Sequence, residues 1–232
     1  MQMVILAGGL ATRLGPLAAQ CPKSMLLIEG KPFLQHQIEW IRQNHVTDIV
    51  LCIGHLGHKI ESYFGDGERF GVSIRYSKES DKLLGTGGCL KKALPLLEDA
   101  FFVMYGDSYL MLDSGEIERE FLRHPDCGLM VVYRNENRYD QSNLEVRDGW
   151  VVEYGMGNHP QKHYIDEGIS VMRADFFEPF KEKEVFGLPL VFEKLIAARK
   201  LCAMETRQRF YEIGSREGFE EFQNLIKARS KK

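Results

Sequence analysis

The chain has 232 residues, of which 44% are hydrophobic and 27% charged, and its net charge at pH 7 is −3. This length allows one sizeable core, and the small negative charge excludes a general attraction to nucleic acid or to an acidic membrane, so any anion site must be local. The five cysteines form no CxxC pair, and no apolar run approaches the 18 residues of a membrane span. We expect a cytoplasmic protein with reduced thiols that binds neither nucleic acid nor a membrane.

Strands and helices alternate in the first half of the chain. Apolar runs and helical periodicity predict strands at 4–7, 48–54, 72–79 and 100–107, and helices at 33–45, 58–65 and 87–98. This alternation is typical of a parallel, doubly wound α/β sheet, in which ligands bind at the carboxyl ends of the strands. Gly8 and Gly9 follow the first strand and Asp107 ends the last, so both fall at such ends.

The second half reads as a mixed sheet. We expect strands at 127–135 and 163–173, a hairpin at 143–155 that turns at Arg147-Asp148-Gly149, a helix around 189–200, a short strand at 209–214 and a terminal helix at 217–230. No linker rich in Pro, Gly or Ser divides the chain, and it contains no internal repeat. We therefore expect one domain over residues 1–232, in which a nucleotide-type half (1–110) and a mixed-sheet half (111–232) share a core.

The first strand leads directly into a glycine-rich, basic turn. Gly8 and Gly9 end the apolar run, and Thr12, Arg13 and Lys23 follow. Backbone N–H groups freed by such a turn can bind phosphate oxygens, and glycine lets a phosphate come close. Neither GxGxxG nor GxxxxGK[ST] is present, and a glycine pair after a strand is more often only a tight turn.

A series of short motifs makes the interpretation more specific. They are LAGGLATRL (6–14), PKSML (22–26), GKPFL (30–34), LLGTGGCL (83–90), YGD (105–107), VVEY (151–154), EGISVMR (167–173) and FYEIG (210–214). In this order they resemble the signature of the sugar-1-phosphate nucleotidylyltransferases, over nearly the whole chain. The resemblance implies a Rossmann-like, doubly wound mixed sheet of the nucleotide-diphospho-sugar transferase type. It also implies that an NTP and a sugar 1-phosphate react to give an NDP-sugar and pyrophosphate.

The phosphate groups of that reaction need cations and N–H donors that neutralise spreading negative charge. Gly8 and Gly9 can offer N–H groups to the triphosphate, and Arg13 can bind the departing β- and γ-phosphates with both arms of its guanidinium. The resemblance assigns Lys23 to the α-phosphate and the sugar phosphate. Taken singly, such cations are usually solvated surface charges. The expected nucleotide-binding residues are Leu6, Ala7, Gly8, Gly9, Thr12, Arg13, His55, Gly85, Thr86, Gly87 and Gly106.

Two of these assignments have a simpler alternative. The GTGG stretch at 85–88 also starts a predicted helix, and both roles are compatible. His55 falls near the family's base pocket, but a lone histidine at a strand end is more often merely solvated.

The resemblance implies Mg²⁺ as the cofactor, held by carboxylates near the phosphates. Asp107 matches the family's first metal aspartate, and with Arg13 and Lys23 it completes the expected catalytic set. The second metal aspartate normally lies in an aspartate-isoleucine-glycine sequence, where this chain has Glu212. Glutamate keeps the charge but reaches one methylene further, so Glu212 is either a second ligand or a capping or salt-bridging carboxylate.

The sugar side departs further from the family pattern. A glutamate-lysine pair often lies at the hairpin end, but here Glu153 precedes Tyr154 and the lysine is missing. Lys162, on the following loop, is a possible substitute. Glu167 and Gly168 resemble the strand start over which the sugar ring packs, and Asn143 is placed to reach a hydroxyl. The tail carries no left-handed β-helix repeat, which excludes a trimeric acetyltransferase extension.

Among the family's branches, the short chain, LGTGG and FYEIG most resemble the heptose- or mannose-1-phosphate guanylyltransferases. This favours GTP with D-glycero-D-manno-heptose 1-phosphate or mannose 1-phosphate, in a monomer or homodimer. No single residue distinguishes guanine from uracil, thymine or cytosine, so a uridylyl- or thymidylyltransferase acting on a hexose or amino-sugar 1-phosphate is the alternative. A non-catalytic nucleotide-sugar-binding regulator is the alternative of another class, although the retained Arg13, Lys23 and Asp107 argue against it.

Overall fold

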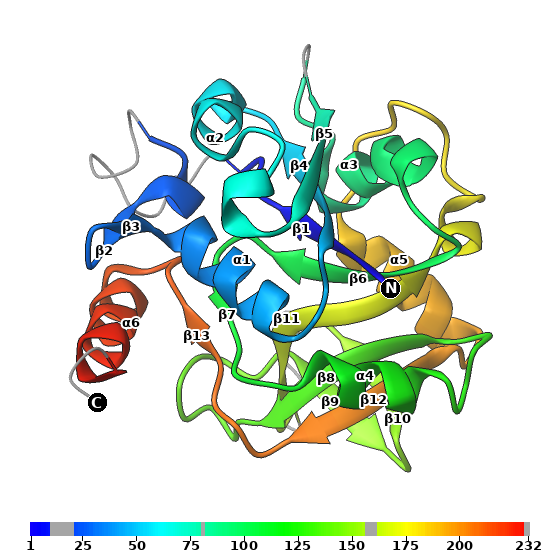
Figure 1. Cartoon of the computed structure of the whole chain (residues 1–232). Helices are drawn as coiled ribbons and strands as arrows, with labels where there is room; N and C mark the ends of the chain where they lie inside the picture. Colours follow the sequence, from blue (N-terminus) through cyan, green and yellow to red (C-terminus); the bar gives the residue numbers. More distant parts are fainter. Residues whose placement is uncertain (10–20, 80–81, 156–161, 230–232) are drawn as a thin grey trace.

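A nine-stranded sheet forms the centre of the computed structural model, which describes residues 1–9, 21–79, 82–155 and 162–229. Its strands are β1 (Gln2–Leu6), β4 (Asp48–Ile53), β5 (Ser73–Lys78), β6 (Ala100–Tyr105), β8 (Gly128–Arg134), β9 (Leu144–Arg147), β10 (Trp150–Tyr154), β11 (Tyr164–Arg173) and β12 (Leu201–Thr206). They lie in the order β5-β4-β1-β6-β11-β8-β12-β10-β9 (Figure 1). Both halves of the sequence therefore contribute to one sheet, and they meet where β6 pairs with β11.

The strands of the first half are parallel, as the alternation predicts. β1 pairs in parallel with β4 on one side and with β6 on the other, and β5 extends the sheet beyond β4. Successive side chains point to opposite faces, so Met3 and Ile5 pack in one core and Val4 in the other. Because both faces of β1, β4 and β6 are buried, these three strands read as continuous apolar runs, whereas the edge strand β5 (SIRYSK) does not.

Helices cover both faces of the sheet. α1 (Phe33–Gln43), α2 (Gly57–Phe64), α4 (Ser114–Phe121) and α6 (Arg216–Arg229) contribute buried side chains to the core on one face. α3 (Gly85–Ala93) and α5 (Leu188–Ala197) contribute to the core on the other. The predicted doubly wound, mixed α/β fold is thereby confirmed. Within the described ranges, no helix combines the length and apolar character needed to cross a bilayer.

The second half of the sheet is mixed. β11 runs antiparallel to β6 and β8, while β12 runs parallel to β8. The β9–β10 hairpin turns where predicted, because Asp148 (φ +50°) and Gly149 (φ +78°) both adopt the left-handed conformation that tight hairpin turns require.

Several elements differ from the sequence-based expectation. β12 and α4 were not predicted, and the strand expected at 209–214 is only β13 (Tyr211–Glu212), which pairs with β7 (Ser108–Tyr109). A small hairpin of β2 (Leu27–Ile28) and β3 (Lys31–Pro32) precedes α1. The helix expected at 87–98 ends at Ala93 and continues as a 3₁₀ turn that contains Pro95, which has no N–H to extend an α-helix.

Candidate active site

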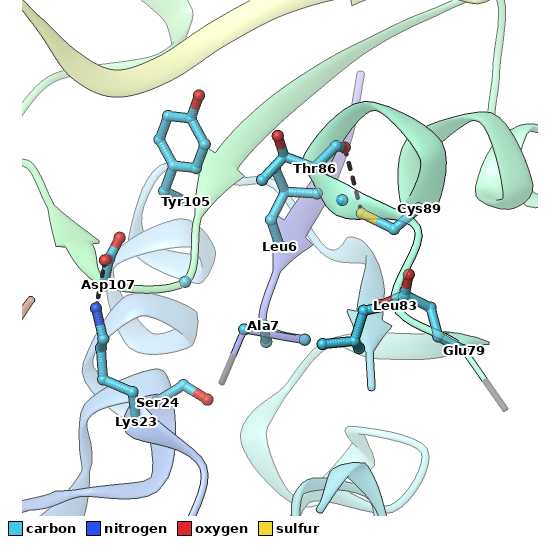
Figure 2. A pocket seen from close by; sticks show the side chains of 14 residues that line it. Leu6, Ala7, Lys23, Ser24, Glu79, Leu83, Thr86, Cys89, Tyr105 and Asp107 are labelled. Atoms are coloured by element: carbon cyan, nitrogen blue, oxygen red, sulfur yellow. Dashed lines mark hydrogen bonds and ion pairs between the residues drawn. The ribbon is translucent and has the colours of Figure 1, made fainter. Parts of the chain in front are cut away.

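A cavity of about 310 Å³ opens at the carboxyl ends of β1 and β6, where the sequence predicts a ligand site. We call it the strand-end cavity. The end of β1, the turn after β6, the start of α3 and the 3₁₀ turn Lys23–Met25 form its walls (Figure 2). The predicted site residues that line it are Leu6, Ala7, Gly8, Gly9, Lys23, Gly85, Thr86, Gly106 and Asp107.

Close backbone packing requires glycine around the end of β1. Gly106 donates its N–H to Leu6 O at 3.1 Å, and a Cβ at Gly106 would lie 2.6 Å from that oxygen. A Cβ at Gly8 would lie 3.0 Å from the Glu79 carboxylate and 3.2 Å from Gly54 N, whereas no atom of the described residues lies within 4 Å of a Cβ at Gly9. Among the described residues, the glycine edge is therefore packed at Gly8 and uncovered at Gly9.

Lys23 and Asp107 form an ion pair in the strand-end cavity. Lys23 Nζ lies 2.7 Å from Asp107 Oδ2, and their side chains are 15% and 30% exposed (Figure 2). Lys23 comes from the 3₁₀ turn after the glycine-rich segment, and Asp107 from the turn after β6, 84 positions away. The fold thus brings a cation and an anion from two distant motifs to one point of the cavity wall.

Gln37 holds the backbone on both sides of Asp107. This fully buried side chain of α1 donates through Nε2 to Tyr105 O at 2.9 Å and to Ser108 O at 2.7 Å. Asp107 O itself accepts the N–H of Ile213 at 2.9 Å. The turn that carries Asp107 is therefore tied to α1 on one side and to the segment after β13 on the other.

Glu212 lies on the strand next to this turn. β13 places it opposite Ser108, one residue beyond Asp107. Its carboxylate accepts the Ser215 hydroxyl at 2.6 Å and also the Gly214 N–H, and Ser215 Oγ accepts the Gly218 N–H in turn. Ser215 thus caps the first turn of α6, and Glu212 holds Ser215 and the turn before the helix, which is close to the capping alternative named for Glu212 above.

The donor set at this position fits Mg²⁺ in its usual mode of binding. In the described parts of the chain, no group of three or more His, Cys, Asp or Glu side chains gathers as a metal centre. Mg²⁺ at phosphate sites, however, commonly uses one or two carboxylates and completes its shell with phosphate oxygens and water. Asp107, partly exposed in the cavity, offers such a carboxylate, and Glu212 lies on β13 opposite the residue after Asp107.

Gly85 and Thr86 line the cavity, but Gly87 does not. The GTGG stretch begins α3, as predicted, and Gly85 has a φ of +76° that favours glycine. A Cβ at Gly87 would lie 2.4 Å from the Phe186 ring, so this glycine allows α3 to pack on the segment before α5. Thr86 Oγ1 accepts the N–H of Leu188 at 2.8 Å and ties the same two segments together.

Of the three remaining predicted nucleotide contacts, only His55 lies within the described residues. His55 is exposed and is not among the lining residues. Thr12 and Arg13 lie outside the described residues, so their expected contact with the triphosphate stays a prediction.

Sequence reasoning missed part of the cavity wall. Glu79 follows β5 and its Oε1 accepts the Leu84 N–H at 2.6 Å. Burial raises the pKa of Glu79, while the Leu84 N–H and Lys92 oppose the shift. The rule that ligands bind at strand ends would have found Glu79, because it is the last residue of the strand predicted at 72–79. The other unpredicted lining residues are Ser24, Leu83, Cys89 and Tyr105.

The predicted sugar-side residues form two groups. In one, the buried Lys162 lies 3.1 Å from Glu153 Oε1 and also donates to Gly155 O. Lys162 thus lies beside Glu153, the residue after which the sequence lacks the family's lysine. In the other, Asn143 Oδ1 accepts the Asp166 N–H at 3.1 Å, next to Glu167 and Gly168.

Glu167 is a buried acid with no hydrogen-bond partner among the described residues. It is 1% exposed, and neither carboxylate oxygen forms a hydrogen bond within the described part of the chain. Burial, reinforced by the Asp166 charge, raises the pKa of Glu167 to about 9, so the side chain is a neutral acid at pH 7. Gly168 (φ +85°) follows it, and a Cβ there would meet the Ser108 hydroxyl at 2.4 Å. A neutral carboxyl group both donates and accepts, which suits a ligand rich in hydroxyl groups.

Comparisons with known proteins agree with this geometry. The family model of the nucleotidyl transferases matches residues 2–139. The chain is 29% identical over 223 residues to the D-glycero-alpha-D-manno-heptose 1-phosphate guanylyltransferase of Campylobacter jejuni, covering 96% of this chain and 98% of that protein. A protein of the same name from Aneurinibacillus thermoaerophilus is 29% identical over 218 residues, which cover 92% of this chain and 93% of that one.

A solved structure has a similar fold along its whole length. HddC from Yersinia pseudotuberculosis, crystallised in complex with GMP-PN, matches with a TM-score of 0.82 and 25% identity. The match covers 97% of this chain and 99% of that one.

Proposed function

Because the chain belongs to the nucleotidyl transferase family, we propose that it transfers GMP from GTP to a heptose 1-phosphate and releases pyrophosphate. The predicted membership among the sugar-1-phosphate nucleotidylyltransferases is confirmed by the family match and by the relatives. The observation that carries the proposal is the Lys23–Asp107 pair, which lines the same cavity as Gly8 and Gly9 at the end of β1. Mannose 1-phosphate is the second sugar we consider, since mannose-1-phosphate guanyltransferases are also similar to this chain.

The residues of the strand-end cavity act by position and charge. A sugar phosphate is already ionised at neutral pH, so its oxygen attacks the α-phosphate without a general base. The open backbone at Gly9 is available to phosphate oxygens, and Lys23 Nζ can neutralise charge that develops on the α-phosphate. A Mg²⁺ ion held by Asp107 supplies further neutralisation of the phosphates when it is bound. We assign Arg13 to the departing β- and γ-phosphates by its place in the motif.

On the sugar side, we assign the hydroxyl groups to Glu153, Glu167 and Asn143, and the sugar phosphate to Lys162 and Lys23. Two of these choices rest on physical grounds. Glu167 is neutral and has no hydrogen-bond partner in the described part of the chain, so it can exchange hydrogen bonds with a hydroxyl group without the desolvation of a charge. Lys162 is buried beside Glu153, which keeps a cation on this side of the sheet despite the missing hairpin lysine.

Glu79 supports guanine as the base. One of its carboxylate oxygens accepts the Leu84 N–H, while the carboxylate also lines the strand-end cavity. Guanine presents two adjacent donors, N1–H and the 2-amino group, whereas uracil and thymine present only N3–H. A carboxylate in the cavity wall can accept hydrogen bonds from both donors of guanine but from only one donor of uracil or thymine. It therefore favours guanine.

We expect Glu79→Gln to reduce the preference for GTP. An amide has one acceptor oxygen, for which the Leu84 N–H and the base would compete. The ratio of kcat/KM for GTP to that for UTP should fall about tenfold, the value of one charge-assisted hydrogen bond. Steady-state kinetics with both nucleotides measure the ratio, and Glu116→Gln, on the exposed face of α4, is the matched control. An unchanged ratio would remove Glu79 from base selection.

A pyrophosphate-release assay tests the proposed function itself. Four NTPs are combined with the 1-phosphates of heptose, mannose, glucose and N-acetylated amino sugars. We expect the highest kcat/KM with GTP and heptose 1-phosphate. A maximum with UTP or dTTP would establish the alternative uridylyl- or thymidylyltransferase. Nucleotide binding without any pyrophosphate release would identify a non-catalytic regulator.

A further inference from the structure

Tyr154 directly follows Glu153, at the position where the family pattern has a lysine. Its ring packs against Phe192 of α5 with a centroid distance of 5.0 Å, and its hydroxyl donates to Asp166 Oδ2 at 3.1 Å. A tyrosine hydroxyl is neutral at pH 7, so Tyr154 cannot bind a sugar phosphate as a lysine would. The contact with Asp166 indicates a different role.

Asp166 connects three segments through its carboxylate and its N–H. Oδ2 accepts the Tyr154 hydroxyl of β10, and Oδ1 accepts the N–H of Gly168 at 2.8 Å. The Asp166 N–H donates to Oδ1 of Asn143, directly before β9, at 3.1 Å. The Asp166 side chain is therefore held by β10 on one side and by its own strand on the other.

These contacts surround an irregular stretch of β11. The pairing of β11 with β8 shifts in register between Asp166 and Ser170, and Gly168 in this stretch has a φ of +85°. An irregularity of this kind bends a strand and redirects the side chains within it. Glu167, which we assign to a sugar hydroxyl group, lies between Asp166 and Gly168. The Asp166 contacts thus fix the part of the strand that carries Glu167.

We propose that Tyr154 is a positioning residue for the sugar 1-phosphate and acts through Asp166 on the irregular stretch 166–170, an inference that rests on the proposed function. Loss of the Tyr154 hydroxyl would remove the donor to one oxygen of a partly buried carboxylate. The stretch would then be held by fewer contacts, and Glu167 would be less well ordered before the sugar binds. Binding must then order it, which lowers the affinity for the sugar 1-phosphate.

The charge of Asp166 depends on pH near neutrality. In the described part of the chain, the titratable side chains placed against it are Tyr105 of β6, Tyr154 of β10 and Glu167 of its own strand. Burial raises the pKa of Asp166 to about 6, while the Gly168 N–H and the Tyr154 hydroxyl oppose the rise. Asp166 is therefore ionised at pH 7, and without the Tyr154 hydroxyl its pKa should lie higher.

Initial rates of pyrophosphate release by the full chain test the inference, with the nucleotide and the sugar 1-phosphate that the wild type uses best. Tyr154→Phe keeps the ring and removes only the hydroxyl. We expect the KM for the sugar 1-phosphate to rise about tenfold at pH 7, as for the loss of one hydrogen bond to a charged group. In contrast, kcat and the KM for the nucleotide should change by less than about twofold.

Tyr164→Phe is the matched control. It removes another hydroxyl of β11 that donates to a carboxylate, Glu205 Oε2 at 3.3 Å. All of its kinetic parameters should equal those of the wild type, and a thermal melt of each variant checks that it is folded.

The pH profile separates positioning through Asp166 from a general structural effect. The sugar KM of the wild type should rise as the pH falls through about 6, and in Tyr154→Phe the rise should begin about one pH unit higher. Protonation of the substrate phosphate is common to both enzymes and cancels in the comparison. Asp166→Asn keeps an acceptor for the Gly168 N–H but does not titrate. Its rise at acid pH should be smaller than that of the wild type, and Asp166→Asn/Tyr154→Phe should show the same profile as Asp166→Asn.

An unchanged sugar KM and pH profile in Tyr154→Phe would overturn the inference. A rise at acid pH as large in Asp166→Asn as in the wild type would do the same, even if Tyr154→Phe does not fold. A loss of kcat as large as the rise in KM would also contradict it, because the hydroxyl would then act on the reacting groups. These results require an active wild type. A wild type that releases no pyrophosphate with any sugar 1-phosphate would instead overturn the proposed function, and the inference with it.

Discussion

Asp107→Asn is expected to reduce kcat about 1,000-fold, because a neutral amide replaces the carboxylate that we assign to Mg²⁺ and several kcal/mol of charge stabilisation are lost. The side chain keeps its size, and its ion pair with Lys23 is partly exposed, so the thermal midpoint of unfolding should change little. Pyrophosphate release measured over a range of Mg²⁺ concentrations, together with a thermal melt, checks both expectations.

Glu212→Gln, compared with Asp107→Asn, tests whether Glu212 also binds the metal. Both residues lie at the β7–β13 pair, but the Glu212 carboxylate is bound by the turn before α6. We expect a smaller loss of kcat than for Asp107→Asn, and a higher Mg²⁺ concentration at half-maximal activity if Glu212 also reaches the metal. An unchanged Mg²⁺ dependence would show that Glu212 only stabilises the start of α6. A fully active Asp107→Asn enzyme would remove Asp107 from the metal site.

Lys23→Ala should lower kcat about 100-fold or more while the KM for the nucleotide changes much less. The reason is that Lys23 neutralises charge that grows on the α-phosphate only as the transition state forms. Lys23→Arg keeps the charge but replaces a compact ammonium with a planar, forked group, so we expect partial activity from it. Steady-state kinetics with varied nucleotide separate the two parameters.

An effect of Lys23→Ala on the nucleotide KM alone would contradict this role and make Lys23 a binding residue. Lys31→Ala is the matched control, because Lys31 lies a short distance along the chain and forms an exposed ion pair with Glu39. Its kinetics should equal those of the wild type.

The parallel half of the fold could be predicted from the sequence because its signals are local. Strands that are buried on both faces require unbroken apolar runs. Glycine is needed where such strands end, because the backbone of Gly106 lies within hydrogen-bond distance of Leu6. Asp148 and Gly149 similarly marked the hairpin turn, since that turn needs two left-handed residues in succession.

Other elements carried no such signal. β12 (LCAMET) is short and lacks clear alternation, so its strand character depends on pairing with β8 in the middle of the sheet. β13 is limited to two residues because β7, its partner, offers no more. These elements form because they pair with distant segments of the chain. A local sequence pattern does not predict such pairing.

The sequence by itself determined the class of fold, the family and the chemical types at the site: the glycine edge, a lysine and a carboxylate at strand ends. Only the tertiary structure decided how these groups are held and joined. It placed Gln37 against the backbone of Ser108, 71 positions away, paired Lys162 with Glu153, and buried Glu167 with no hydrogen-bond partner among the described residues. The physical reason is that turn chemistry and periodicity act between neighbours in the chain. Hydrogen bonds, burial and pKa depend instead on which distant segments the folded sheet brings into contact.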